Sequence, residues 1–355
     1  MTTLEQNEIY NRQIYIWLFF CAGLIFCMIL LGGVTRLTHS GLSMVEWKPL
    51  MGIIPPLNTK EWQESFDLYK LYPEYQKINK GMSISEYKYI FMYEYLHRIL
   101  GRVIGIFFLI PFLFFFFTNR IKKKLTPKLS IMFFLGGFQG LLGWYMVKSG
   151  LVNIPSVSQY RLTAHLGNAV IIYGYMLWVA FGLLEDSKQS LMTSASNITK
   201  GIRVSSYAIT GLLFFMILSG GLVAGTRAGL AYSTFPLMGE TFIPVGLYSS
   251  SPFWLSAFED ITTIQFNHRM FAYFLFVLIF SFSIYTIRKL DSSIIRSVLA
   301  CMLILLTLQV CLGIATILLY VPVSIAAAHQ SGAIALLTVS IFLSRFFYDH
   351  SRSSQ

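Results

Sequence analysis

The feature that most constrains the fold is a series of long apolar runs separated by short polar connections. A helix that spans a lipid bilayer needs about 20 mostly apolar residues, and eight runs of this chain are long enough. The runs are uniformly apolar rather than alternating, which favours helices over the strands of a membrane barrel. We therefore predict an all-α integral membrane protein with eight transmembrane helices. They lie near residues 14–35, 89–118, 129–148, 161–184, 204–225, 264–287, 294–319 and 325–347.

The composition excludes water-soluble classes of protein. Only 12% of the residues are charged and the mean hydropathy is +0.62, whereas soluble domains carry about 25% charged residues. The net charge of +11 does not indicate a partner nucleic acid, because the basic residues cluster in short connections between apolar runs. The clearest cluster lies in residues 119–128. Positive charge in this position is typical of the cytoplasmic loops of membrane proteins.

The distribution of Lys and Arg also predicts the orientation of the chain in membrane lipid. Basic residues gather in the connections at 119–128, 185–203 and 288–296, and the positive-inside rule places these connections in the cytoplasm. Both termini are then cytoplasmic, and a long loop over residues 36–88 lies on the outer side. Residues 1–13 resemble neither a transit peptide nor a cleaved signal. We therefore expect an uncleaved first span in a bacterial inner membrane.

The two halves of the chain carry an ordered series of matching residues. Because four spans per repeat is an even number, both copies enter the membrane from the same side and are related by an axis along the membrane normal. We predict two pseudo-symmetric four-helix bundles, residues 1–190 and 191–355, each with its own core. The matches are Gly32-Gly33 with Gly220-Gly221, Thr35-Arg36 with Thr226-Arg227, Gly41-Leu42 with Gly229-Leu230, His97-Arg98 with His268-Arg269, Gln139 with Gln309, and His165 with His329.

Four of the six histidines lie inside predicted spans, two in each half. Ionisable groups at membrane depth are costly and usually mark function, although a single one can serve only an interhelical hydrogen bond. Two imidazoles that face each other across a bundle can bind both faces of a haem iron. Zinc would require three or four protein ligands, which neither half offers. The four residues, all in the outer half of the bilayer in the predicted topology, are His97, His165, His268 and His329.

Arginines close to these histidines suit the propionates of a haem. Arg98 and Arg269 each follow a histidine directly, and Arg36 and Arg227 close the first and fifth spans on the outer side. Because arginine binds carboxylates in bidentate fashion, we predict propionate contacts, although arginines at these depths can also snorkel to the interface. His39 in the adjacent loop is either exposed or an assisting group at the first site.

One asymmetry distinguishes the halves. Glu94 lies three residues before His97, on the same helical face, whereas the position before His268 holds Gln265, which does not ionise. The difference predicts a reaction site in the N-terminal half and an electron-handling haem in the C-terminal half. The predicted catalytic residues are Glu94, His97 and His165. Glu94 could instead serve only as the ion-pair partner of the arginine that follows His97.

Several segments occur together in an ordered combination: 32–38, 40–43, Glu94-Tyr95-x-His97-Arg98, 138–143, Asn267-His268-Arg269 and the surroundings of His165 and His329. In this combination the chain resembles the haem A synthase family. The resemblance covers roughly residues 12–347 and is closest to the subgroup shared by alphaproteobacteria and mitochondria. Other bacterial members carry paired cysteines in the outer loops, but the four cysteines of this chain all lie inside apolar runs, so no role for a loop disulfide carries over.

This resemblance implies the conversion of haem O to haem A for the biogenesis of terminal oxidases. The C8 methyl of the porphyrin is oxidised to a formyl group, through successive hydroxylations and dehydration of a gem-diol. The resemblance also implies a resident haem b bound by His268 and His329, a substrate haem O bound by His97 and His165, and a catalytic carboxylate at Glu94. Cooperation with the protohaem farnesyltransferase that makes haem O is expected as well.

Two other functions fit parts of the pattern. A di-haem b-type electron carrier or quinol oxidoreductase would also have four paired histidines, but it needs no carboxylate confined to one half. A transporter built from two repeats would have broken helices and polar residues at the midplane of the bilayer. The four histidines lie too near one face for that.

Overall fold

All regular elements in the part of the chain that the structure describes are helices. The computed structural model describes residues 3–46, 53–150, 157–187 and 198–352, and eight helices in these ranges are long and apolar enough to cross a membrane. The predicted all-α fold with eight membrane-spanning helices is therefore confirmed. These helices are α1 (Thr3–Leu37), α4 (Ile84–Phe117), α5 (Thr126–Gly150), α6 (Gln159–Ser187), α7 (Lys200–Thr226), α9 (Ile261–Lys289), α10 (Ser293–Leu318) and α11 (Val323–Arg352).

The helices extend beyond the apolar runs, most clearly at the start of the chain. The first apolar run begins near residue 14, but α1 begins at Thr3. No glycine or proline interrupts residues 3–13, so polar residues with adequate helix propensity continue the helix past the apolar run. α4 also begins earlier than its apolar run, at Ile84, where a capping box between Ser83 and Glu86 satisfies the first backbone N–H groups.

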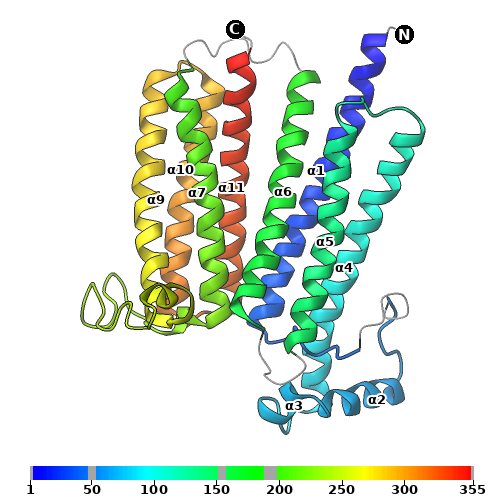
Figure 1. Ribbon diagram of the computed structural model, residues 1–355, viewed down its shortest axis with the longest axis vertical. Coiled ribbons are helices and arrows are strands. Elements are labelled where there is room, and N and C mark those ends of the chain that lie inside the picture. The colour runs from blue at the N-terminus through cyan, green and yellow to red at the C-terminus, as the bar shows by residue number, and fades with distance from the viewer. Residues whose placement is uncertain (1–2, 47–52, 151–156, 188–197, 353–355) are drawn as a thin grey trace.

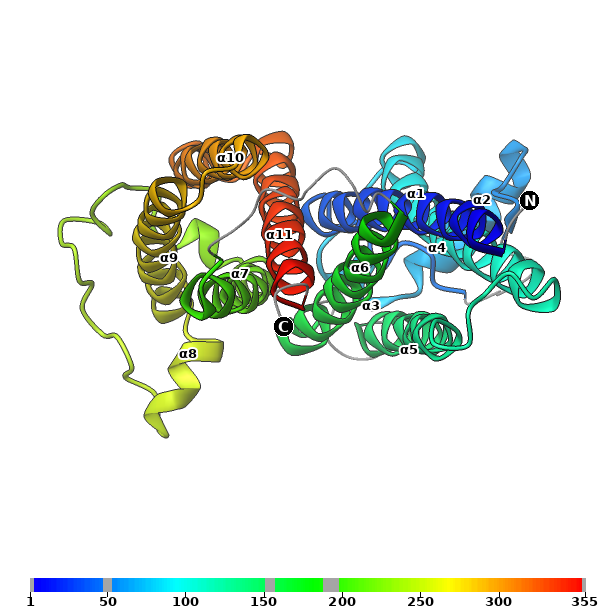
Figure 2. The same ribbon diagram turned by 90° about the horizontal axis from the view of Figure 1, so that it is seen from above.

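The membrane-spanning helices form two groups of four (Figure 2). The N-terminal group contains α1, α4, α5 and α6, and the C-terminal group contains α7, α9, α10 and α11. This arrangement is consistent with the two pseudo-symmetric bundles that the repeat predicts. The predicted boundary between residues 190 and 191 lies outside the described residues, so the division into 1–190 and 191–355 stays a prediction.

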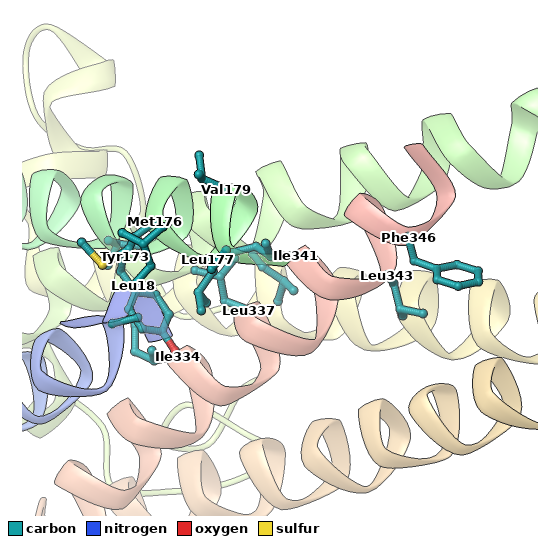
Figure 3. Close-up of a cluster of buried hydrophobic side chains, with 14 of the residues drawn as sticks. Leu18, Tyr173, Met176, Leu177, Val179, Ile334, Leu337, Ile341, Leu343 and Phe346 are labelled. Carbon is teal, nitrogen blue, oxygen red and sulfur yellow. The ribbon is translucent and has the colours of Figure 1, made fainter. Parts of the chain in front are cut away.

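The apolar core is continuous across the two groups, contrary to the prediction that each bundle has its own. One cluster of buried side chains includes Leu18 of α1, Leu177 of α6 and Ile334 of α11. Figure 3 shows these side chains where α6 meets α11. The hydroxyl groups of Tyr173 on α6 and Thr338 on α11 add a hydrogen bond of 2.7 Å. The repeat predicts equivalent helices, but it contains no information on how much apolar surface the two copies bury against each other.

Two glycines allow α7 to approach α6 closely at this junction. Gly221 and Gly225 lie four residues apart, on one face of α7. A Cβ atom on Gly225 would lie 2.7 Å from Cα of Gln159, and one on Gly221 would lie 3.1 Å from Oγ1 of Thr163. Small residues at this spacing let helices pack closely in membranes, where van der Waals contact drives association. The junction therefore depends on the absence of side chains at these positions.

Both ends of the described chain lie at one end of the molecule, as the predicted topology requires (Figure 1). The connections between α4 and α5 and between α9 and α10, which carry basic residues, lie at the same end. The first outer loop and the loop that precedes α9 lie at the opposite end. The basic connections and the long loops therefore lie at opposite ends of the molecule.

The first outer loop folds against the start of α4. It contains two short helices, α2 (Thr59–Lys70) and α3 (Pro73–Lys77). Phe66 and Tyr69 of α2 stack on the ring of Tyr87 of α4, with centroid distances of 5.0 Å and 5.1 Å. These rings belong to a small apolar cluster separate from the main core. The cluster attaches the loop to the helix that carries the first of the paired histidines.

Gly225→Ala should destabilise the protein, because the added methyl group would overlap the backbone of Gln159. Overpacking of this kind costs about 1–3 kcal/mol, which thermal unfolding of the purified protein in detergent would detect. Gly211→Ala is the matched control: it lies on the same helix with no neighbouring atom within 4 Å of the added Cβ, and it should be neutral or stabilising. Equal melting temperatures for the two variants would contradict the close contact.

Candidate functional site

The four membrane-embedded histidines form one pair in each group of helices. His97 on α4 and His165 on α6 are close enough to interact electrostatically, and so are His268 on α9 and His329 on α11. Among the described residues, no group of three or more His, Cys, Asp and Glu side chains could hold a metal ion. Two imidazoles do not complete a zinc site. They suit a haem, because the porphyrin supplies the other four iron ligands.

Each of these histidines packs against a glycine of the preceding membrane-spanning helix. A Cβ atom on Gly32, Gly143 or Gly313 would press against the imidazole ring, whereas one on Gly220 would only touch it. We call the four glycines the seats of the rings. The arrangement repeats in both halves, and it gives the rings a fixed place between apolar helices. The distances from a Cβ atom on the glycine to Cε1 of the ring are 3.0 Å for Gly32 and His97, 3.0 Å for Gly143 and His165, 3.6 Å for Gly220 and His268, and 2.9 Å for Gly313 and His329.

The two pairs differ in the hydrogen bonds of their ring nitrogens. In the C-terminal pair, Nδ1 of His268 lies 3.0 Å from Oγ of Ser219, and Nδ1 of His329 lies 3.1 Å from the backbone oxygen of Gln309. A histidine bonded through Nδ1 keeps Nε2 as its ligand nitrogen. In the N-terminal pair, both Nδ1 atoms are buried and have no hydrogen-bond partner among the described residues. The C-terminal pair is therefore the better prepared to bind an iron.

The carboxylate of Glu94 lies one turn before His97 and accepts hydrogen bonds on both oxygens. Arg98 donates to Oε1 at 2.5 Å, and Oγ of Ser43 and the backbone N–H of Met44 each donate to Oε2 at 2.8 Å. The Glu94 side chain is only 4% exposed. The ion pair with Arg98 is thus present, and the first outer loop closes over the same carboxylate.

The C-terminal half uses an amide at the equivalent position. Nε2 of Gln265 donates to the backbone oxygen of Tyr232 at 3.0 Å, and Arg269 donates to the same oxygen at 3.1 Å. In the N-terminal half, Arg98 donates in the same way to the backbone oxygen of Met44 at 2.8 Å. Both halves therefore attach an outer loop to a histidine-bearing helix, but only the N-terminal half places a buried carboxylate there.

The other two predicted arginines cross the junction between the groups. Nη2 of Arg36 donates to the backbone oxygen of Gly225 at 3.1 Å, and Nη2 of Arg227 donates to Nδ1 of His39 at 3.2 Å. His39 is exposed, one of the two possibilities that the sequence left open. Partial burial and the positive charges of Arg227 and Arg36 lower the pKa of His39, so its ring is neutral at pH 7 and accepts this bond. Propionate binding by the arginines stays a prediction.

A second buried carboxylate, Glu74 on α3, was not predicted from the sequence. Its side chain accepts a hydrogen bond from the hydroxyl of Tyr69 at 3.1 Å, and only 6% of the residue is exposed. Burial raises the pKa of Glu74 to about 7, with a smaller contribution from the negative charge of Glu94. An acidic residue in a polar loop normally remains solvated, so the sequence carried no signal for its burial.

Comparison with known proteins identifies the family. A family model described as cytochrome oxidase assembly protein matches residues 15–341. A protein of Nitrosospira multiformis named Heme A synthase is 49% identical over 96% of this chain and 94% of its own length. The chain belongs to the haem A synthase family.

Other relatives in the haem A synthase family have similar coverage. A protein of this name from Parvibaculum lavamentivorans is 44% identical over 96% of both chains. One from Agrobacterium fabrum is 43% identical over 95% of this chain and 91% of its own. The four membrane-embedded histidines lie within the range that the family model matches, and the match confirms the resemblance read from the sequence.

Gly143→Ala should reduce haem binding at the N-terminal pair, because the added methyl group would displace the His165 ring from its seat. Gly140→Ala on the same helix is the matched control, since no atom lies within 4 Å of its added Cβ. The haem bound by each purified variant after incubation with haem b can be measured by absorbance. Equal binding by both variants would contradict a role for the seat.

Glu74→Gln should remove part of the pH dependence of stability. The folded protein holds a proton on Glu74 up to about pH 7, whereas the usual pKa is 4.5. The stability gained from this proton is full below about pH 4.5 and is lost as the pH rises through about 7. Melting temperatures should therefore fall more between about pH 5 and pH 8 in the wild type than in Glu74→Gln. Glu64→Gln, whose side chain is 66% exposed, should follow the wild type; parallel pH profiles for all three proteins would refute the assignment.

Proposed function

We propose that this protein is a haem A synthase, an integral-membrane oxidoreductase that converts haem O to haem A for terminal oxidase biogenesis. It oxidises the C8 methyl of the porphyrin to a formyl group. Haem O is the substrate of the N-terminal group of helices, and haem b is the resident cofactor of the C-terminal group. The relatives named Heme A synthase support this activity, with identities of 41% to 49% over almost the whole chain.

The observation that carries the assignment of sites is a buried carboxylate at one of two otherwise matching histidine pairs. Glu94 and Gln265 occupy equivalent positions and both fasten an outer loop. An amide fastens a loop equally well without the cost of burying a charge. A carboxylate at the first site alone therefore indicates that this site needs a group able to take up protons.

We assign the following roles at the substrate site. His97 and His165 hold the iron of haem O and thereby fix the porphyrin between the helices. The conversion of the methyl group to a formyl group needs an electron acceptor and an oxygen source from outside this chain. The step that we assign to a residue of this chain is the acceptance of a released proton by Glu94 as a general base. Ser43 and Met44 position its carboxylate through their hydrogen bonds.

At the resident site we assign the two iron ligands to His268 and His329. Haem b supplies one-electron chemistry when it is bound there. The hydrogen bonds at the two Nδ1 atoms would leave Nε2 of each ring free to bind the iron.

The four arginines are proposed to neutralise the haem propionates. Nε of Arg36 and Nε of Arg269 are buried and have no hydrogen-bond partner among the described residues. These N–H groups are the donors that we assign to propionate oxygens. Arg98 and Arg227 contribute positive charge beside the same two sites.

We propose that the protein lies in a bacterial inner membrane with both termini in the cytoplasm. The end of the molecule that carries the termini also carries the basic connections (Figure 1), which the positive-inside rule assigns to the cytoplasm. Haem O carries a farnesyl tail and partitions into lipid. A protohaem farnesyltransferase in the same membrane is therefore the partner that supplies the substrate.

Glu94→Gln should abolish product formation without loss of the resident haem. Removal of a general base costs about 10²- to 10⁴-fold in rate, and the amide can still fasten the outer loop as Gln265 does. Haem O is supplied to membranes that contain the variant, and haem A is measured by extraction and chromatography. Glu86→Gln, an exposed carboxylate change on the same helix, is the control and should leave the rate unchanged.

Two outcomes would contradict the proposal. Wild-type formation of haem A by Glu94→Gln would remove the catalytic assignment of this residue. Absence of any formyl-porphyrin from the wild-type protein would favour the di-haem electron carrier, in which neither haem is a substrate.

A further inference from the structure

The residue that precedes each of the first glycine seats differs between the halves. Ser219 precedes Gly220 in α7, and Leu31 precedes Gly32 at the equivalent position of α1. Oγ of Ser219 lies 3.0 Å from Nδ1 of His268. A leucine offers no hydrogen-bonding group, and the matching Nδ1 atom of His97 is buried with no hydrogen-bond partner among the described residues.

If His268 binds a haem iron, the hydroxyl of Ser219 would influence that iron through the imidazole ring. When Nε2 of a histidine binds a metal, Nδ1 carries the proton and donates to its partner, which is then Oγ of the serine. This bond fixes the orientation of the ring and makes the imidazole a stronger electron donor. The backbone oxygen of Gln309 holds the ring of His329 in a similar way. A carbonyl oxygen can only accept a hydrogen bond, so Nδ1 of His329 must be the donor. Both ligands of the C-terminal site are therefore anchored.

The second histidine of the N-terminal pair is held in a manner that opposes iron binding. Nε2 of His165 lies 3.3 Å from Nε2 of Gln139. The Gln139 amide is fixed by Asn168, which donates to its Oε1 at 2.8 Å, and by the backbone oxygen of His165, which accepts from its Nε2 at 3.0 Å. An iron at Nε2 must displace this amide. The position that matches Asn168 is Gly332, so the C-terminal half lacks the group that fixes the glutamine.

We propose that Ser219 is a positioning residue that makes the C-terminal site retain its haem, and that Leu31 at the matching position makes the N-terminal pair an exchangeable ligand set. The inference rests on the proposed function, in which one haem is resident and the other must enter as substrate and leave as product. Turnover requires weak ligation at one site, whereas a resident cofactor requires strong ligation at the other. The two halves thus combine the same arrangement of paired histidines with weak ligation at the N-terminal site and strong ligation at the C-terminal site.

Ser219→Ala should accelerate the loss of resident haem b. Loss of a hydrogen bond to a metal-binding histidine typically costs 10- to 100-fold in affinity, so we expect haem transfer to excess apomyoglobin to become about 10-fold faster or more. The midpoint potential of the haem should also become more positive, because a less basic imidazole stabilises the ferric iron less. The full-length protein in detergent is used for both measurements.

Two variants separate this role from a general loss of packing. Ser219→Thr keeps the hydroxyl group and should restore the slow transfer and the wild-type potential. Ser206→Ala removes a different serine of α7, a buried one whose Oγ donates to the backbone oxygen of Arg203 at 2.8 Å. This matched control should leave the transfer rate and the potential unchanged.

The reciprocal change tests the N-terminal site. In a His268→Ala background, added haem b can be ligated from both faces only by the N-terminal pair. Leu31→Ser in that background should slow the transfer of haem b to apomyoglobin, because the serine gives Nδ1 of His97 an acceptor. Unchanged transfer in Leu31→Ser would show that the matching position does not set the strength of ligation.

The results separate a failure of the role of Ser219 from a failure of the assigned resident haem site. If Ser219→Ala releases haem b at the wild-type rate with an unchanged potential, the role of Ser219 is refuted while the resident haem stands. If the wild-type protein holds no haem b that depends on His268, the assignment of the resident site fails, and the inference fails with it. Faster release together with a more positive potential, both restored by Ser219→Thr, supports the proposal.

Discussion

The site depends on the placement of four half-buried imidazole rings between apolar helices. A polar ring at membrane depth is costly unless it has both space and partners. The glycine seats provide the space, because each ring lies where the preceding helix has no side chain. The absence of side chains at Gly221 and Gly225 likewise lets α7 approach α6 closely at the junction between the two groups. Small residues therefore hold the rings in position and join the halves that carry them.

The two halves share this frame and differ in the groups around it. A carboxylate at Glu94 is replaced by the amide of Gln265, and the leucine at position 31 is replaced by Ser219. Both halves keep a glycine beside the first histidine, Gly32 and Gly220. Each replacement changes the chemistry available at one ring: the first supplies a proton acceptor and the second supplies an anchor. Duplication of a four-helix unit followed by such local changes can produce a substrate site and a cofactor site on one scaffold.

The sequence predicted the features that depend on local pattern. The length of the apolar runs determines the membrane-spanning helices, and the repeat identifies His97, His165, His268 and His329 as two pairs. It did not predict contacts between distant segments. The shared core, the bonds of Arg36 and Arg227 across the junction, and the burial of Glu74 depend on how the halves and the outer loop pack. Such packing leaves no periodic signal in the chain.

The most direct test of the central claim, two equivalent histidine pairs with different haems, is the haem b content of His268→Ala and His97→Ala after purification. We expect His268→Ala to lose the resident haem b and His97→Ala to keep it. Full retention of haem b by His268→Ala, together with its loss from His97→Ala, would contradict the account and assign the resident haem to the N-terminal half.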